Sequence, residues 1–278
     1  PHNPGTVYIA TTRYKFNDHT PAIFKSTNYG KTWKNVSKGI LQGDFTRVIR
    51  EDSFKENLIY VGTQNGLYLS WNGGNKWYKL NLNLPVVPIT DMTVKGSDLV
   101  IATQGRAFWI LDDLNLIRQY DDNLKLYQTE KTIMPNWYSS MNNNSSSGTN
   151  LLQGVNPPSG MVIYYSLPNL KSNQEVKLKI LNSDGEIVNS FTSISDKNHV
   201  DYEGGPSKKN KLSSKKGINR FVWNLRYSML KGIPKAYIEG SYGGHKAIPG
   251  NYKLILSYSE KTFEISAEIL KNPMQSVS

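Results

Sequence analysis

The chain contains no cysteine, so its 278 residues can form no disulfide, offer no thiol nucleophile and hold no zinc through thiolates. This absence fits a cytosolic protein and a secreted bacterial protein equally well. The four histidines are scattered, and neither a His-Glu-x-x-His nor a Gly-x-Ser-x-Gly motif occurs. The sequence therefore gives no support to a zinc-dependent or serine hydrolase, and we expect neither a metal nor a cofactor.

Long apolar runs are also missing. Runs such as Met161–Tyr165 fall well short of the roughly eighteen residues that a membrane-spanning helix needs. Spacing typical of amphipathic helices is nearly absent, whereas short stretches rich in Val, Ile, Tyr and Thr alternate with Gly, Asn and Asp. With 38% hydrophobic residues, the chain has the composition of a globular protein. We predict an all-β protein, long enough for two domains, with no membrane span.

Acidic residues are fewer than basic ones, 22 against 33, which gives a net charge of +11. Lysines are densest in residues 207–216, which carry Lys208, Lys209, Lys211, Lys215 and Lys216. Such a run could bind nucleic acid or another anionic polymer. No arginine or aromatic residue is interleaved with these lysines, so we favour a solvated loop and expect no nucleic-acid partner.

The tripeptide Gly30-Lys31-Thr32 resembles the end of a phosphate-binding loop, but such a loop needs a glycine where this chain has Lys25. The stretch belongs instead to a turn that occurs twice. The two copies share four residue types, at Ser26, Asn28, Gly30 and Trp33 and again at Ser70, Asn72, Gly74 and Trp77. We predict a structural role, in which Ser and Asn hold turn amides, Gly allows a positive φ and Trp fills the gap between sheets.

A strand sequence also recurs, as VYIATTR (residues 7–13), IYVGTQN (59–65) and LVIATQG (99–105). The last two copies are about forty residues apart, the period of a four-stranded propeller blade. The same offset aligns residues 67–69 with residues 107–109. The first unit is longer because residues 14–22 are inserted between its strands. The first part of the chain is therefore predicted to form β-propeller blades.

The repeated turns resemble the Asp-box, or bacterial neuraminidase repeat, of sialidases, certain glycoside hydrolases and sortilin-like receptors. That motif is usually Ser-x-Asp-x-Gly-x-Thr-Trp; the first copy departs from it at Asn28, and the second at Asn72 and Lys76. Residues 59–74 and 98–114 also resemble the last blades of large secreted bacterial proteins described as sortilin-like or glycosyl-hydrolase-like. The resemblance covers roughly residues 1–120, and it implies a fold and a secreted or cell-surface location more than an activity.

A second β domain is expected after a polar stretch. Residues 175–191 predict a hairpin around Ser183–Gly185, and residues 218–227 and 249–258 predict further strands. Their order resembles the immunoglobulin-like domain of flagellar hook-capping proteins, where a Pro-Gly-x-Tyr turn precedes a late strand. The predicted core residues alternate along these strands: Val176, Leu178, Ile180, Val188, Phe221, Trp223, Leu225, Tyr252 and Leu254. The predicted organisation is propeller blades in residues 1–128, a linker in 129–160 and an immunoglobulin-like β-sandwich in 161–272.

Two carboxylate pairs, Asp112-Asp113 and Asp121-Asp122, are candidates for acid/base chemistry. Adjacent strand residues point to opposite faces, so neither doublet makes a joint pair by itself; helix or turn geometry could change that. We favour solvated turn residues. A sialidase would also need three arginines around its substrate's carboxylate, and the blade arginines form no recognisable triad motif: Arg13, Arg47, Arg50, Arg106 and Arg118.

Three residues are candidate ligand contacts. Arg106 follows a repeated strand, Tyr14 opens the inserted segment and Trp137 lies in the predicted linker, where an aromatic ring could stack on a sugar or anchor a core. The catalytic residues stay unknown. The chain opens at Pro1 without an initiator methionine, and we expect it to be the C-terminal part of a longer protein.

Two functions fit this sequence. We favour a secreted or cell-surface bacterial module that binds or scaffolds a protein, peptide or glycan. The alternative is part of a glycoside hydrolase whose catalytic residues lie mainly in blades absent from this chain. Two and a half blades cannot close a ring of four to eight, so we expect the remaining blades on the same or another chain as partners.

Overall fold

The computed structural model describes residues 1–80, 82–134, 158–168, 174–233, 236–237 and 239–274. Its regular structure is almost entirely β, with one short 3-10 helix, η1 (Tyr14–Phe16), and one short α-helix, α1 (Leu114–Gln119), among these residues. None of the described helices could span a bilayer. The all-β prediction is confirmed. Contacts divide the chain into unit 1, Pro1–Arg118, and unit 2, Gln119–Ser278.

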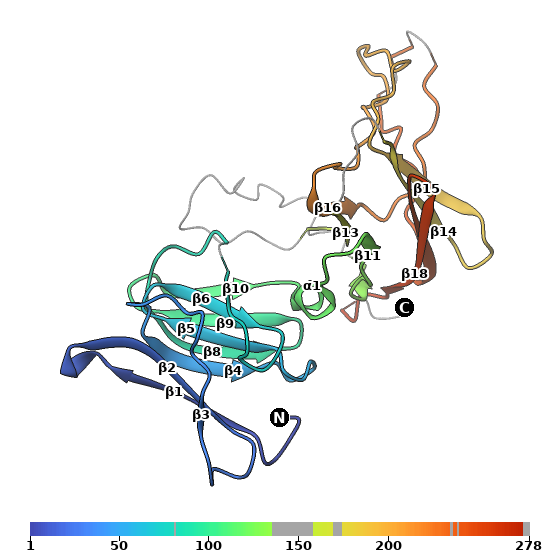
Figure 1. The fold of residues 1–278 in the computed structure, drawn as a ribbon. Coiled ribbons are helices and arrows are strands. Elements are labelled where there is room, and N and C mark those ends of the chain that lie inside the picture. Colours follow the sequence, from blue (N-terminus) through green and yellow to red (C-terminus); the bar gives the residue numbers. More distant parts are fainter. Residues whose placement is uncertain (81, 135–157, 169–173, 234–235, 238, 275–278) are drawn as a thin grey trace. The chain divides into compact units, whose positions relative to one another are not determined.

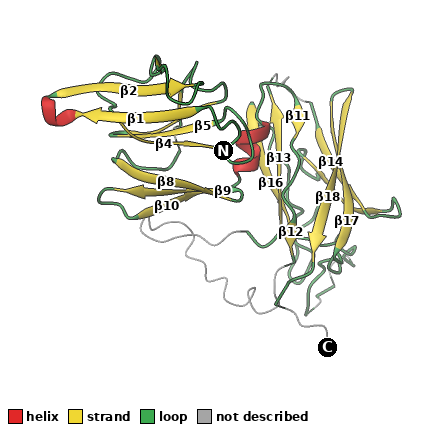
Figure 2. Ribbon diagram, turned by 90° about the horizontal axis from the view of Figure 1, so that it is seen from below, coloured by secondary structure: helices red, strands yellow, loops and turns green. Residues whose placement is uncertain are grey.

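Unit 1 contains three antiparallel sheets in which each strand pairs with the next along the chain (Figures 1 and 2). Sheet 1 is β1 (Val7–Arg13), β2 (Asp18–Ser26) and β3 (Lys34–Asn35). Sheet 2 is β4 (Thr46–Glu51), β5 (Ile59–Thr63), β6 (Gly66–Ser70) and β7 (Tyr78–Lys79). Sheet 3 is β8 (Ile89–Lys95), β9 (Asp98–Thr103) and β10 (Phe108–Leu111). Consecutive meanders stacked face to face are the arrangement of propeller blades.

Strand β5 lies at the centre of this stack, and all five of its residues are buried. Ile59 and Val61 belong to the core between sheets 1 and 2, and Tyr60 belongs to the core between sheets 2 and 3. A Cβ atom on Gly62 would come within 2.5 Å of the Ile89 side chain, so the two sheets approach too closely there for a side chain. A strand covered on both faces must be apolar throughout, which explains why IYVGT lacks polar alternation.

The repeat alignment needs one correction. Thr63 pairs with Gly66 across a two-residue turn, whereas Ala102 pairs with Phe108 because Arg106 lengthens the equivalent turn. Trp109 consequently lies opposite Ile101, as Tyr68 lies opposite Val61. The offset that aligned residue 68 with residue 108 is therefore wrong by one, because a constant offset cannot follow an inserted turn residue.

Unit 2 is a β-sandwich of two sheets. One sheet is β11 (Lys125–Leu126), β13 (Met161–Leu167) and β16 (Gly217–Trp223); the other is β12 (Thr132–Ile133), β18 (Lys261–Leu270), β17 (Gly250–Tyr258), β14 (Val176–Leu181) and β15 (Ile187–Thr192). A single hydrophobic core fills the sandwich. All of the core residues expected from sequence belong to it: Val176, Leu178, Ile180, Val188, Phe221, Trp223, Leu225, Tyr252 and Leu254. The expected hairpin is β14–β15, joined around Ser183–Gly185.

The division between the units falls earlier than residue 128, the end predicted for the blades. Strand β11 pairs with β13, and β12 pairs in parallel with β18, so residues 125–126 and 132–133 lie in the sheets of unit 2. Strands of two residues are too short to show a period in sequence. The sequence pattern therefore assigns residues 125–126 to the blades and residues 132–133 to the linker. Most of that predicted linker, residues 135–157, lies outside the described residues.

Candidate functional site

Three equivalent turns lie at one end of unit 1. They are residues 14–17 between β1 and β2, residues 64–65 between β5 and β6, and residues 104–107 between β9 and β10. Because β1, β5 and β9 are copies of one strand in stacked sheets, their following turns emerge at the same end, which we call the turn end (Figure 2). Two of the predicted contact residues, Tyr14 and Arg106, lie in these turns.

Tyr14 is part of a cluster of two rings and a guanidinium. Its ring stacks on Phe45, with centroids 5.3 Å apart and planes 19° from parallel. The Arg47 guanidinium lies 5.8 Å from the centroid of Tyr14 and 5.2 Å from that of Phe45. Gln64 Oε1 accepts hydrogen bonds from Arg47 Nε, at 3.0 Å, and from Nη2, at 2.6 Å. The cluster therefore ties the inserted segment to the turn of sheet 2.

The cluster is partly open to solvent. Tyr14 is 40% exposed, whereas Phe45 is buried and supports it from below. His19, also from the inserted segment, places its ring edge-on to Phe45 at 5.5 Å. Cation–π contact and the two hydrogen bonds that it donates to Gln64 hold Arg47 in one orientation before any ligand arrives. The arrangement offers an aromatic edge and a fixed cation side by side.

Asp44 lies beneath the same turn end and is almost fully buried. Its oxygens accept hydrogen bonds from the Tyr68 hydroxyl, from Asn65 Nδ2 at 2.6 Å and from Lys79 Nζ at 3.0 Å. Burial alone raises the pKa of the Asp44 carboxyl, but the hydrogen bonds and the charge of Lys79 outweigh it, so that the pKa is lower than usual. Burial and the hydrogen bond to Asp44 raise the pKa of Tyr68. Asp44 is thus a charged structural anchor for the turn and a poor proton donor.

Arg106 lies in the turn between β9 and β10, and its side chain is exposed. Its backbone carbonyl accepts a hydrogen bond from the Trp109 indole at 3.0 Å. Within the described residues its guanidinium forms no ion pair or hydrogen bond, and no ring or polar contact links it to the Tyr14 cluster. The structure therefore places Arg106 and Tyr14 at one end of the stack without joining them. Trp137 lies outside the described residues.

The two repeated turns share the hydrogen bonds from turn amides to their serine and asparagine side chains. Ser26 Oγ accepts from the Gly30 amide at 2.9 Å, and Asn28 Oδ1 accepts from the Thr32 amide at 2.9 Å. In the second copy, Ser70 Oγ accepts from the Gly74 amide at 3.0 Å, and Asn72 Oδ1 accepts from the Lys76 amide at 2.9 Å. Both glycines have positive φ, 80° at Gly30 and 91° at Gly74. These polar groups are engaged within the turns.

The tryptophans of the two turns differ in environment. Trp77 is 6% exposed, and its indole donates to the Val36 carbonyl of the preceding sheet at 2.7 Å. Trp33 is 42% exposed. Sheet 1 thus supplies the surface on which Trp77 packs, whereas the described residues supply no equivalent surface for Trp33.

The carboxylates of the second doublet, Asp121-Asp122, form local hydrogen bonds. Asp121 accepts from Lys125 Nζ at 2.9 Å, and the hydrogen bonds from Lys125 and Asn123 lower its pKa. Asp122 accepts from the Tyr120 hydroxyl at 2.8 Å. Asp113 occupies the left-handed region, with φ 60°. Among the described residues, no group of three His, Asp or Glu side chains is placed to hold a metal.

No family model matches the chain, and no curated protein matches it. Among solved structures, it is similar to an ancestral GH74 enzyme, with a TM-score of 0.35 and 14% identity over 69% of this chain and 26% of that one. It is also similar to the extracellular domain of a one-component system, BT4673, from B. thetaiotaomicron, with a TM-score of 0.27 and 13% identity over 90% of this chain and 29% of that one. The chain spans less than a third of either structure's length, and at these TM-scores the likeness carries no conclusion about activity or ligand.

Proposed function

We propose that the chain is a binding and scaffold module, part of a larger secreted or cell-surface bacterial protein with Asp-box propeller blades, and that it holds a ligand at the turn end without chemical turnover. The observation that carries this proposal is the Arg47 guanidinium, fixed by Gln64 against the rings of Tyr14 and Phe45. A site held in its bound geometry in advance loses less side-chain entropy when a ligand arrives.

The chemistry of the cluster suits a glycan best and a peptide less well. An exposed aromatic ring can pack against the apolar face of a sugar, and a neighbouring guanidinium can donate to its hydroxyl or carboxylate oxygens. The carboxylate of Asp44, the residue before Phe45, already accepts hydrogen bonds from Tyr68, Asn65 and Lys79. Binding is therefore better supported at this end of unit 1 than acid/base catalysis.

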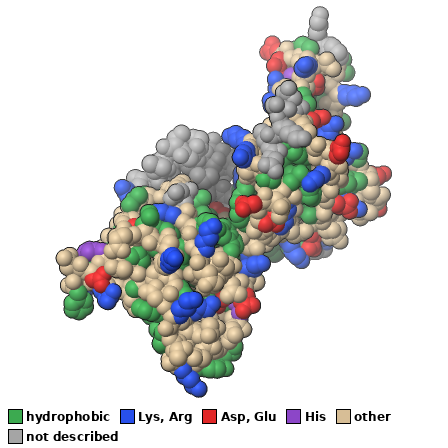
Figure 3. Space-filling model, in the orientation of Figure 1, with side chains coloured by type: hydrophobic (Ala, Val, Ile, Leu, Met, Phe, Trp, Pro, Cys, Tyr) green, Lys and Arg blue, Asp and Glu red, His purple; other side chains and the backbone are tan. Residues whose placement is uncertain are grey.

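Further blades are the partners we propose for unit 1. Val7 and Ile9 of β1 are 40% and 41% exposed, whereas their counterparts Ile59 and Val61 in β5 are 0% exposed. Ile59 and Val61 are buried because sheet 1 covers them. Apolar side chains reach the surface around the first sheet in the lower part of Figure 3. A blade packed on that face would bury residues that otherwise leave an apolar surface in water.

A glycan array, followed by titration of the best ligands, tests the binding proposal. Tyr14→Ala and Arg47→Gln are expected to raise Kd by about tenfold or more, because the first removes the exposed ring of the cluster and the second removes its cation. Tyr29→Ala is the matched control, since Tyr29 is another exposed tyrosine of unit 1, located away from the turn end. Equal weakening by all three variants would contradict a site at the turn end.

A panel of aryl-glycosides and polysaccharides distinguishes binding from glycoside hydrolysis. The purified chain is expected to release no sugar. Sustained release that is lost in Asp112→Asn or Asp113→Asn would favour the hydrolase alternative, because hydrolysis uses a pair of carboxyl groups.

A further inference from the structure

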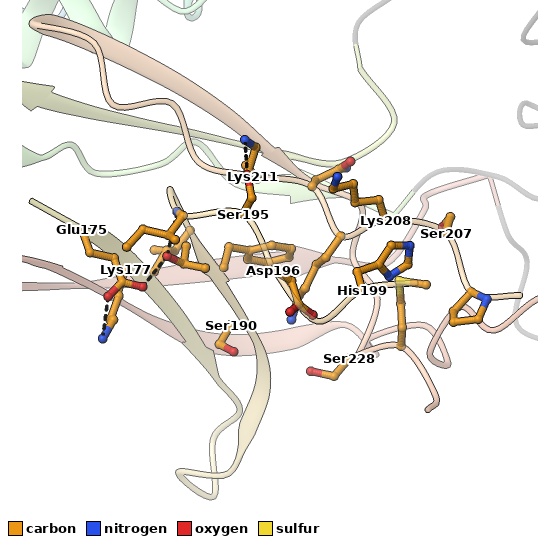
Figure 4. Close-up of a pocket in the computed structure, with 18 of the residues that line it drawn as sticks. Glu175, Lys177, Ser190, Ser195, Asp196, His199, Ser207, Lys208, Lys211 and Ser228 are labelled. Atoms are coloured by element: carbon orange, nitrogen blue, oxygen red, sulfur yellow. Dashed lines mark hydrogen bonds and ion pairs between the residues drawn. The ribbon is translucent and has the colours of Figure 1, made fainter. Parts of the chain in front are cut away.

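A groove of about 590 Å³ lies in unit 2, along the edge strand β15. Its walls come from β14, from β15 and from the segment of residues 194–211 that follows β15. Figure 4 shows the Glu175–Lys177 pair toward one end of this groove and Lys208 with His199 toward the other. The volume is within the range of sites that enclose small ligands. None of the turn-end residues of unit 1 contributes to it.

Five lysines line this groove: Lys177, Lys179, Lys208, Lys209 and Lys211. Only two carboxylates line it with them, Glu175 and Asp196, and Glu175 is paired with Lys177 at 2.9 Å. Within the described residues, none of the other four lysines has an ion-pair partner. The described lining of the groove therefore carries more lysines than carboxylates, an excess of positive charge.

The sequence suggests a solvated loop for these lysines, but two of them contact other residues of unit 2. Lys209 Nζ lies 5.3 Å from the centroid of Phe191, a buried ring. Partial burial lowers the pKa of Lys209, although the residue as a whole stays exposed. Lys211 Nζ donates to Ser195 Oγ at 2.9 Å, and the Leu212 amide donates to the Thr192 carbonyl at 3.0 Å. These contacts hold the lysine segment against the sandwich, where an anion could contact several ammonium groups at once.

The other lining residues include both apolar and hydroxyl-bearing side chains. Phe191, Ile194 and Met229 contribute apolar surface, and Ser190 and Ser228 contribute hydroxyl groups. A sugar ring has both an apolar face and hydroxyls, so it matches this mixture. Nucleic acid matches it less well, because no arginine is among the described lining residues and the ring of Phe191 is covered rather than free for base stacking.

We propose that this groove binds an acidic oligosaccharide, with its carboxylate or sulfate groups on Lys179, Lys208 and Lys211 and a sugar ring against Ile194 and Met229. The ammonium groups supply charge, and the apolar wall and serine hydroxyls select a sugar over a bare anion. The site is separate from the turn end, so it stands whether or not unit 1 binds a ligand.

The test measures binding of the whole chain to oligogalacturonate, which carries carboxylates, and to a heparin oligosaccharide, which carries sulfates. Each is titrated at 50 and 150 mM NaCl, because screening weakens exposed charge pairs as salt rises. Lys179→Glu and Lys208→Glu are expected to raise Kd for the bound glycan by about tenfold each. Lys261→Glu changes the charge by the same amount at an exposed position outside the groove, and a change of less than about twofold is expected there. Melting temperatures confirm that the variants are folded.

Several outcomes would overturn the proposal. One is the absence of binding to both glycans at 50 mM NaCl. Another is equal weakening by Lys261→Glu and Lys208→Glu, which would indicate attraction by net charge alone. Single-stranded DNA or oligoglutamate binding more tightly than both glycans would assign the groove to another class of ligand. Tighter binding of one glycan than the other identifies carboxylate or sulfate as the group that the lysines bind.

Discussion

The protonation of Asp44 changes the free energy of unfolding of the protein. Its pKa is below the ordinary value of 3.8, so the folded state favours the ionised form. The stability that it contributes is therefore fully present above about pH 4–5 and is lost as the pH falls through the lowered pKa, because the unfolded chain then binds the proton first.

We predict that Asp44→Asn lowers the free energy of unfolding at pH 7 by on the order of 2–3 kcal/mol, as expected for lost hydrogen bonds to a charged group. The difference between the variant and the original chain should shrink between pH 5 and pH 3. Urea unfolding across this range measures it. Asp91→Asn is the control, because Asp91 pairs with Arg50 while 65% exposed. A difference that does not change with pH would contradict the charged role of Asp44.

At the scale of elements, the repeated turn is the clearest feature of unit 1. Both copies share the hydrogen bonds from turn amides to Ser and Asn, yet among the described residues the second copy alone has a sheet on which its tryptophan packs. The two positions therefore separate the energy of the turn from the energy of packing between sheets.

We predict that Trp77→Ala costs about 3–5 kcal/mol of stability, the range for removing a buried aromatic ring. Trp33→Ala should cost about 1 kcal/mol or less, since that ring is 42% exposed. Chemical unfolding of both variants provides the comparison. Similar losses at the two positions would mean that the tryptophan stabilises the turn itself rather than the contact between sheets.

Much of this element structure could be predicted from the sequence. The three copied strands and the alternating core residues of unit 2, such as Val176 and Leu178, follow from spacing within one segment. The extra turn residue before β10 and the two-residue strands β11 and β12 left no periodic signal. The lysine groove was also missed, because it depends on residues 207–211 folding back onto β14 and β15, a contact that local sequence does not specify.

At the scale of the whole molecule, each unit has its own hydrophobic core. The clusters of unit 1 are built around β5, and the cluster of unit 2 surrounds Trp223, which is fully buried and whose indole donates to the Arg226 carbonyl at 2.9 Å. Separate cores favour separate unfolding, because the packing of each core lies within its own unit.

We predict two calorimetric transitions for the chain. Trp223→Ala should cost about 3–5 kcal/mol in unit 2 and lower one transition by roughly 10 °C or more, while the other stays within about 2 °C. Trp77→Ala should lower the other transition. A single transition that both variants lower equally would show that the two units unfold together.

The turn that carries Arg106 has a consequence for how unit 1 can change. All four residues of β10, Phe108–Leu111, are apolar, and their pairing with β9 directs Trp109 and Leu111 toward sheet 2 and leaves Phe108 and Ile110 exposed at 75% and 59%. Composition alone would permit either face to point inward, so the register of the two strands makes the choice. The turn before β10 is one residue longer than the turn between β5 and β6, yet Trp109 lies opposite Ile101 just as Tyr68 lies opposite Val61. The turn end can therefore gain or lose residues for a new ligand without reversing the strand that follows, provided that the register with β9 is kept.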